Sequence, residues 1–176
     1  MTTKDIVYIA LFAALTAALG IVPPIPTGFG INITAQSLGV MLAGSLAGAR
    51  RGGLAMMLFL ALIAIGLPLL AGGRGGMAAL VGPWSGYVLA WPLCAFLIGA
   101  LLARRKDANV WLIGAIIAFG GIVVMHAFGI VWYAIFSEIP LGVAFVNNSI
   151  FIPGDLVKVV IAALLTNGLR RAYPNL

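Results

Sequence analysis

Asp155 and Lys158 are the two residues whose types and spacing most directly indicate chemistry. They stand three positions apart in FIPGDLVKVVIAALL, residues 151–165, at the edge of a long apolar run. On a helix this spacing puts an acceptor and a donor on one face. Ionisable groups in membrane segments cost about 2.5–3.5 kcal/mol even on lenient scales, and they usually mark a substrate site. The pair would suit a ligand that presents both a donor and an acceptor.

A structural role for the same pair stays open. Pro153 suits the first helical position, so Asp155 would lie in the first turn, where the helix macrodipole favours a negative charge. Lys158 would then neutralise Asp155 and extend its amine toward the membrane interface. The macrodipole disfavours a lysine so near a helix N-terminus, and we therefore favour the ligand site.

Arg74 is a second candidate for ligand binding. It stands in AGGRGGM, residues 71–77, where Gly73 and the other glycines let the backbone turn tightly and leave the side chain unobstructed. A lone guanidinium is well suited to clamp a carboxylate through two hydrogen bonds. The alternative is a solvated loop tip.

Neutral polar and aromatic residues complete the candidate set. Gln36 and Asn147 could add hydrogen bonds to a ligand, although each is equally typical of a helix cap. Trp84 and Tyr87 in GPWSGY could stack on a ring, although both types are common at membrane interfaces. For His126, a single polar group, we favour a structural or interfacial role.

The composition indicates that lipid surrounds most of the chain. Of its 176 residues, 63% are hydrophobic and 8% are charged, and the mean hydropathy is +1.18. A soluble domain of this size needs a more highly charged surface. The net charge of +6 comes from small basic clusters between apolar runs, a pattern that favours membrane topology over nucleic-acid binding. A single cysteine excludes a Cys-based metal site, and we expect no metal and no cofactor.

The elements that must position these residues are predicted to be membrane helices. A bilayer core about 30 Å thick needs about 20 apolar residues per helix. Six segments meet or approach this length: Ile6–Val22, Ala35–Ala49, Gly53–Leu70, Pro83–Ala103, Val110–Phe136 and Gly154–Arg170. The expected fold is an all-α integral membrane protein, a compact bundle of six transmembrane helices that forms one domain over residues 1–176.

The basic residues predict the orientation of this bundle. With six spans, eight of the ten basic residues fall on one side: Lys4, Arg50, Arg51, Arg104, Arg105, Lys106, Arg170 and Arg171. The positive-inside rule puts that side, and both termini, in the cytoplasm. The opposite loops are longer, and the first two are rich in Gly and Pro. We expect irregular backbone in all three, roofing a cavity that opens outward.

Small residues recur along the first predicted helix. Ala10, Ala14 and Ala18 are spaced four apart, which lets two helix backbones approach closely in lipid. The row would pack either against the protein's own helices or against another membrane subunit.

Three stretches together resemble the BioY family, the biotin-binding S components of energy-coupling factor (ECF) transporters. They are INITAQSLGVMLAG, GLPLLAGGRGGMAALVGPWSGYVLA and FIPGDLVKVVIAALL, and with the six apolar segments they cover nearly the whole chain. The GPWSGY stretch departs at Trp84 and Ser85 from the GPTGGY that is typical of the family.

The resemblance implies a subunit of the bacterial cytoplasmic membrane that binds biotin tightly from outside. It further implies a transmembrane coupling subunit, which the alanine row would contact, and ATP-binding-cassette ATPases. The chain itself has no GxxxxGK[ST] phosphate-binding loop, so ATP hydrolysis would belong to those partners. Asp155 could accept from the ureido ring, Lys158 could donate to its carbonyl, and Arg74 could hold the carboxylate; Lys158 and Arg74 could also exchange roles. Tyr87 or Trp84 would cover the apolar face of the ring.

Other functions are less consistent with the sequence. One histidine, one cysteine and four acidic residues offer few groups for an intramembrane enzyme, so we expect no catalysis. A self-sufficient secondary carrier or channel is an alternative, although no clear inverted repeat supports it. An S component for another small anionic vitamin is the remaining alternative.

Overall fold

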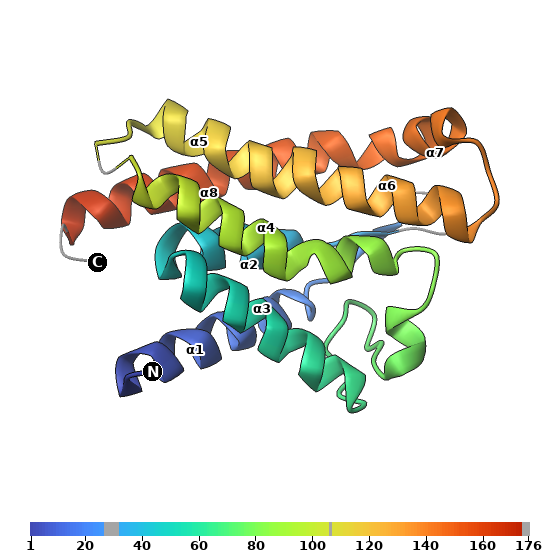
Figure 1. The fold of residues 1–176 in the computed structure, drawn as a ribbon, viewed down its shortest axis with the longest axis horizontal. Coiled ribbons are helices and arrows are strands. Elements are labelled where there is room, and N and C mark those ends of the chain that lie inside the picture. Colours follow the sequence, from blue (N-terminus) through green and yellow to red (C-terminus); the bar gives the residue numbers. More distant parts are fainter. Residues whose placement is uncertain (27–31, 106, 174–176) are drawn as a thin grey trace.

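The computed structural model describes residues 1–26, 32–105 and 107–173, and these are mostly helical (Figure 1). Lys106, one of the predicted cytoplasmic residues, lies outside these ranges.

The α-helices are α1 (Thr3–Leu19), α2 (Gln36–Leu42), α3 (Ala49–Ala64), α4 (Ser85–Ala103), α5 (Val110–Ala118), α6 (Met125–Phe136), α7 (Leu141–Asn148) and α8 (Ile152–Ala172). Two π-helical segments, η1 (Ala43–Ala47) and η3 (Phe119–Val124), extend α2 and join α5 to α6. The 3-10 turns η2 (Met77–Leu80) and η4 (Ser149–Phe151) precede α4 and α8, and strands β1 (Ile25–Pro26) and β2 (Asn32–Ile33) pair as an antiparallel hairpin.

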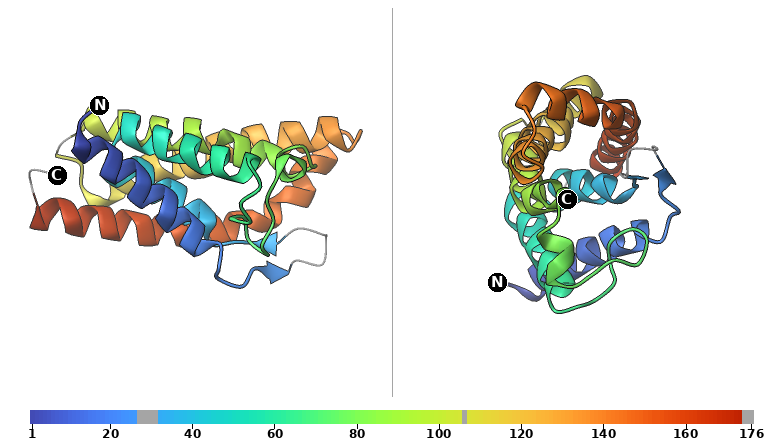
Figure 2. Two further views of the ribbon diagram at one scale, coloured as in Figure 1. Left: turned by 90° about the horizontal axis from the view of Figure 1, so that it is seen from below. Right: turned by 90° about the vertical axis from the view of Figure 1, so that its right-hand side faces the viewer.

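The short helix α2 lies in the middle of the bundle. It contacts α1, α4 and α8, while α3 packs on α1 and α4, and α5 packs on α8 (Figure 2). Val40 and Met41 of α2 are fully buried in the main hydrophobic core. Because α2 begins deep in the bundle, the residues at its start face the interior, where a ligand site can form.

In the part of the chain that the structure describes, three helical runs are long and apolar enough to cross a membrane: Ser85–Ala103, Val110–Phe136 and Leu141–Ala172. The second has the bounds predicted from the sequence. Helices α1 and α3 have 17 and 16 residues, and the run Gln36–Ala47 is shorter still. At a rise of about 1.5 Å per residue, α1 and α3 are about 24–26 Å long, which is slightly less than the thickness of a bilayer core.

The expectation of irregular backbone in all three longer loops was wrong for the last of them. Pro140 caps α7 there, and α7 continues through the turn η4 into α8. Proline fixes φ near a helical value, and Pro140, at φ −57°, stands directly before the first helical residue. Ala144 and Asn148 bury one side of α7 against its neighbours.

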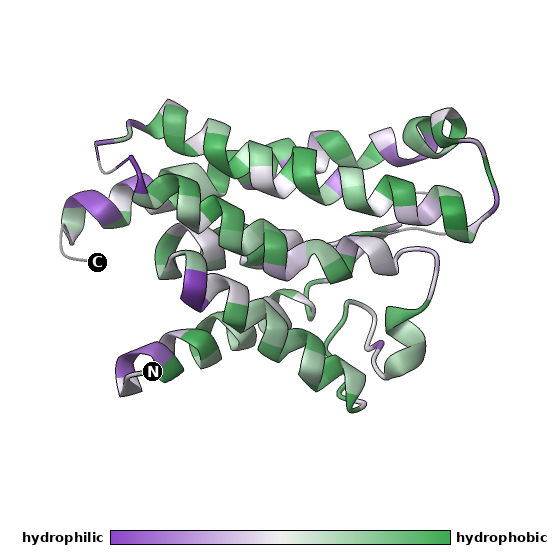
Figure 3. Cartoon of the chain, in the orientation of Figure 1, coloured by the Kyte–Doolittle hydropathy of each residue, from purple (hydrophilic) through white to green (hydrophobic). Residues whose placement is uncertain are grey.

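The most hydrophilic helix ends gather at the end of the molecule that holds both termini (Figure 3). There Arg51 at the start of α3 pairs with Asp5 of α1, with 2.7 Å between Nε and Oδ1. Asp5 also completes a capping box with Thr2. The Thr2 backbone amide and the Arg51 guanidinium hold the pKa of Asp5 well below its usual value. These contacts tie α1 to α3 at this end.

Candidate functional site

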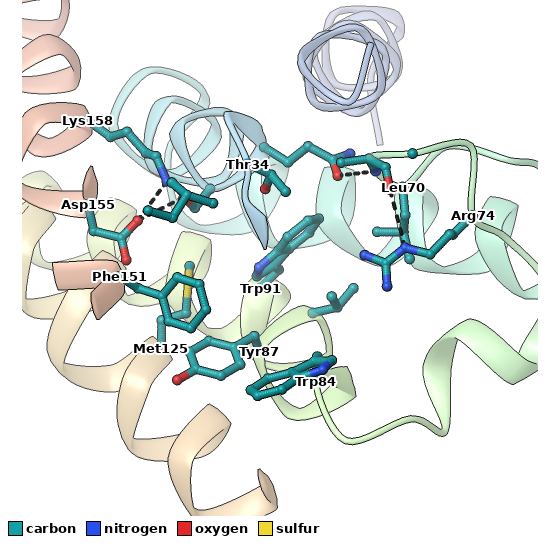
Figure 4. Close-up of a pocket in the computed structure, with 16 residues that line it drawn as sticks. Thr34, Leu70, Arg74, Trp84, Tyr87, Trp91, Met125, Phe151, Asp155 and Lys158 are labelled. Carbon is teal, nitrogen blue, oxygen red and sulfur yellow. Dashed lines mark hydrogen bonds and ion pairs between the residues drawn. The ribbon is translucent and has the colours of Figure 1, made fainter. Parts of the chain in front are cut away.

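A cavity lies toward the end of the bundle away from the two termini (Figure 4). Its volume of about 380 Å³ is within the range of small-molecule sites. The start of α2, the loop after α3, the start of α4, and α8 with the turn before it form most of its wall. Its lining residues are Ile33, Thr34, Gln36, Ser37, Leu70, Ala71, Gly72, Arg74, Trp84, Tyr87, Val88, Trp91, Met125, Phe151, Asp155 and Lys158.

Asp155 and Lys158 form one polar wall of this cavity. Pro153 stands in the first turn of α8, which positions Asp155 there, and Lys158 follows on the same face. The Lys158 amine donates to Oδ1 of Asp155 at 2.8 Å and to Oγ of Ser37 at 2.8 Å. Ser37 also donates to the same carboxylate oxygen at 3.2 Å, and His126 lies 2.9 Å from the other oxygen. A buried charge needs such partners, and this one has them on both oxygens.

Arg74 lies on the opposite side of the cavity (Figure 4). Gly72, Gly73 and Gly76 have positive φ angles, so the loop can fold tightly around the arginine. Leu70 and Arg74 exchange two backbone hydrogen bonds, and Arg74 Nε donates to the Ala71 carbonyl at 3.2 Å. Within the described ranges no carboxylate pairs with Arg74. Its terminal guanidinium nitrogens can therefore hold an anion.

Gln36 anchors the loop that carries Arg74. Its amide nitrogen donates to the Leu69 carbonyl at 2.9 Å and to the Thr16 carbonyl of α1 at 3.2 Å. Its amide oxygen accepts from the Ala71 backbone N–H at 2.9 Å. These bonds occupy the Gln36 amide, so it supports the cavity wall more than it offers hydrogen bonds to a ligand.

Aromatic side chains form the apolar wall between the two polar sides. Tyr87 donates to Asn148 Oδ1 at 2.7 Å and meets Phe151 edge-on. Trp84 stacks on Tyr133, with 4.3 Å between ring centroids. These contacts fix two rings that border the cavity, and fixed rings can cover a flat apolar ligand without losing much side-chain freedom.

The chain is similar to known proteins over its whole length. The sequence profile described as the BioY family matches residues 1–175. The chain belongs to the BioY family. It is 46% identical to the "Biotin transporter BioY" of Rhizobium etli, over 100% of this chain and 98% of that protein. It is 45% identical to the protein of the same name from Rhodobacter capsulatus, over 98% and 96%.

A solved structure extends the comparison to three dimensions. The "S-component for biotin from an ECF-type ABC transporter" superposes with a TM-score of 0.91 at 36% identity, covering 97% of this chain and 95% of that one. The BioY fold therefore extends over nearly the whole chain.

In this BioY chain the structure brings most of the predicted site residues to one cavity. Those that line it are Asp155, Lys158, Arg74, Gln36, Tyr87 and Trp84. Gly73 and Asn147 are not among the lining residues. Gly72, the neighbour of Gly73, lines the cavity, whereas Asn148, the neighbour of Asn147, does not line it and accepts the hydrogen bond of Tyr87.

Sequence reasoning did not single out Ser37 and Trp91, which line the cavity, or the contact of His126 with Asp155. Trp91 follows Tyr87 by one helical turn, a spacing that indicates a shared face of α4. Ser37 and His126 carry no local signal, because each reaches Asp155 from a distant part of the chain. Among the described residues no three His, Cys, Asp or Glu side chains gather as they would around a metal ion.

Proposed function

We propose that this chain is the biotin-binding S component of an ECF-type vitamin importer, capturing biotin from outside and passing it inward. The family, the names of the relatives and the matching S-component structure support this function. The single observation that carries it is the cavity. An acceptor–donor pair lies on one side, an arginine without a carboxylate partner among the described residues lies on the other, and aromatic rings lie between them.

The charges favour one orientation of biotin. The Lys158 amine is already neutralised by Asp155 at 2.8 Å, whereas Arg74 has no such partner in the described part of the chain. A ligand carboxylate is stabilised most by the cation that is not already neutralised, through charge-assisted hydrogen bonds to the terminal guanidinium nitrogens. We therefore place the carboxylate of biotin at Arg74. Its ureido ring lies at Asp155 and Lys158, where it finds one acceptor and one donor.

A binding assay tests this function. The purified chain, titrated by calorimetry with biotin and separately with other small vitamins, should bind biotin with one site per chain. Tighter binding of a different anionic vitamin would contradict the biotin assignment while preserving the S-component class.

We further propose that residues 1–176 act as one domain with six membrane spans, in the bacterial cytoplasmic membrane, with both termini in the cytoplasm. Basic residues stand at ends of α1, α3, α4 and α8, and hydrophilic helix ends gather near the termini (Figure 3), which supports this arrangement. The buried position of α2 also supports it, because a short central helix enclosed by longer ones does not need to span the hydrocarbon core alone.

The exposed side of α1 is proposed as the surface for a transmembrane coupling subunit, which would work with ABC ATPases. Ala10, Ala14 and Ala18 are exposed, whereas Ala13 is 3% exposed and packs in the protein's own core. Only an outward row of small residues can admit a second helix backbone at close range.

A further inference from the structure

Among the described residues, His126 of α6 makes one hydrogen bond, and its partner is Asp155 of the site. Its Nε2 lies 2.9 Å from Oδ2 of Asp155, and both side chains are 7% exposed. The other ring nitrogen, Nδ1, is buried and has no hydrogen-bond partner among the described residues. In the described part of the chain, the hydrogen bond to Asp155 is therefore the polar interaction that accounts for a histidine in this apolar environment.

The two oxygens of the Asp155 carboxylate face different surroundings. Oδ1 binds Lys158 and Ser37, which both line the cavity. Oδ2 binds His126, which does not line it. His126 thus holds the carboxylate from behind the cavity wall. An ionised carboxylate only accepts hydrogen bonds, so the ring must donate through Nε2–H.

Neighbouring rings fix the imidazole itself. Tyr87 meets it edge-on, with 5.3 Å between centroids and planes 87° apart, and Phe151 lies at 6.4 Å. Tyr87 is in turn fixed by its hydrogen bond to Asn148. A ring packed in this way cannot turn away from Asp155 without displacing residues of the cavity wall.

We infer that His126 is a positioning residue for biotin binding, which acts through Asp155 and does not touch the ligand. Without it, Oδ2 would lose its donor, and both carboxylate oxygens would be drawn to Lys158. Asp155 would then bind the Lys158 amine through both carboxylate oxygens, and this contact would compete with the ligand. A carboxylate held in advance avoids this reorganisation, which is how preorganised sites gain affinity. The inference rests on the proposed biotin site.

Two substitutions separate the hydrogen bond from simple packing. His126→Phe keeps a flat ring but removes the donor, whereas His126→Gln keeps a donor. We expect His126→Phe to bind biotin at least about tenfold more weakly and His126→Gln to stay within about threefold of the unmodified chain. Equal affinity of His126→Phe and the unmodified chain would overturn the inference. Absence of biotin binding by the unmodified chain would instead overturn the proposed function.

A double-mutant cycle shows whether His126 acts through Asp155. In an Asp155→Asn background, His126→Phe should weaken biotin binding by no more than about twofold, because the group it positions is already altered. A full tenfold loss in that background would show that His126 acts independently of Asp155, and would contradict the inference.

A measurement on the unmodified protein keeps the test decisive if His126→Phe does not fold. The chain contains one histidine, so nitrogen-15 labelling of histidine gives signals from His126 alone, provided that the purification tag contains none. The spectrum should show a protonated Nε2 with and without biotin. An Nε2 without a proton could not donate to Asp155 and would overturn the inference.

Discussion

At the scale of single residues, the site has a neutral ion pair on one side and, on the other, a cation that no described carboxylate neutralises. Asp155 and Lys158 cancel each other at 2.8 Å, and Ser37 and His126 complete the hydrogen bonds of the carboxylate. Across the cavity, Arg74 donates its Nε–H to its own loop and presents the rest of its guanidinium to the cavity. Such a site favours a ligand that is neutral and polar at one end and anionic at the other, as biotin is.

Replacing Arg74 tests which end of biotin it binds. Arg74→Gln should weaken biotin binding by about 10- to 150-fold, the effect of losing a charge-assisted hydrogen bond worth about 1.5–3 kcal/mol. Biotinamide, which lacks the carboxylate, should bind the variant and the unmodified chain about equally. Competition binding with both ligands measures this. A similar loss for biotinamide would place the carboxylate at Lys158 instead.

Part of this site could be predicted from the sequence, because its most informative pair is local. Asp155 and Lys158 are one helical turn apart, and the cost of charge in an apolar segment makes them conspicuous. Ser37 and His126 reach the same carboxylate across 118 and 29 positions of sequence. No periodicity encodes such contacts, because they depend on how α2, α6 and α8 pack together.

At the scale of elements, Gln36 joins three parts of the molecule. Through its hydrogen bonds to Thr16, Leu69 and Ala71, it links the last turn of α1 and the start of α2 to the arginine loop. A helix end leaves its last carbonyls without partners within the helix, and Gln36 satisfies one of them. The position of Arg74 therefore depends on α1 as well as on its own loop.

Gln36→Ala should loosen this loop. We expect at least about fivefold weaker biotin binding, since the change removes hydrogen bonds worth about 0.5–1.5 kcal/mol each. Hydrogen exchange at the Ala71 amide should be faster. Ser45→Ala is the matched control, because it removes the buried Thr166–Ser45 hydrogen bond, whose residues do not line the cavity. If biotin affinity falls by the same factor in Gln36→Ala and Ser45→Ala, Gln36 acts through the general stability of the protein and not through the loop.

The helices were more predictable than their connections. Long apolar runs predicted α4, the α5–α6 run and α8 closely, because lipid exposure requires such runs. The segment before α8 was misjudged, because irregular backbone was expected in all three outer loops. In the folded protein, residues 141–148 form a helix that packs beside α6. Tertiary contacts decided that segment, and they are not visible in local sequence.

At the scale of the whole molecule, α1 has small residues on two sides: Ala13 on the side toward the core, and the outer row Ala10, Ala14 and Ala18 on the exposed side. Ala13 packs inward, and Ala14 is exposed. If the outer row receives a coupling subunit, Ala14→Trp should abolish co-purification with that subunit and energised uptake while leaving biotin binding unchanged.

The control for Ala14→Trp is Ala115→Trp, an equally large change on the exposed face of α5, which lies far from α1 (Figure 1). It should preserve both co-purification and uptake. Loss of biotin binding in Ala14→Trp would mean that the outer row supports the protein's own packing.

Membrane orientation can be measured directly with single cysteines. Met77→Cys lies on the loop side of the cavity, and Asp107→Cys lies in the α4–α5 connection; both positions are exposed. In a Cys94→Ala background, an impermeant thiol reagent added to intact cells should label Met77→Cys, and should label Asp107→Cys only after lysis. Labelling of both from outside would contradict the six-span arrangement.

The most direct test of the central claim is the affinity of the purified chain for biotin with and without the Asp155 carboxylate. Asp155→Asn keeps the shape of the side chain but removes its charge and one acceptor oxygen. Calorimetric titration should give one biotin per unmodified chain, and an affinity about 10- to 150-fold weaker for Asp155→Asn. Unfolding curves recorded without ligand control for folding. Equal affinity in the two proteins would show that the Asp155–Lys158 pair is structural and would contradict the account.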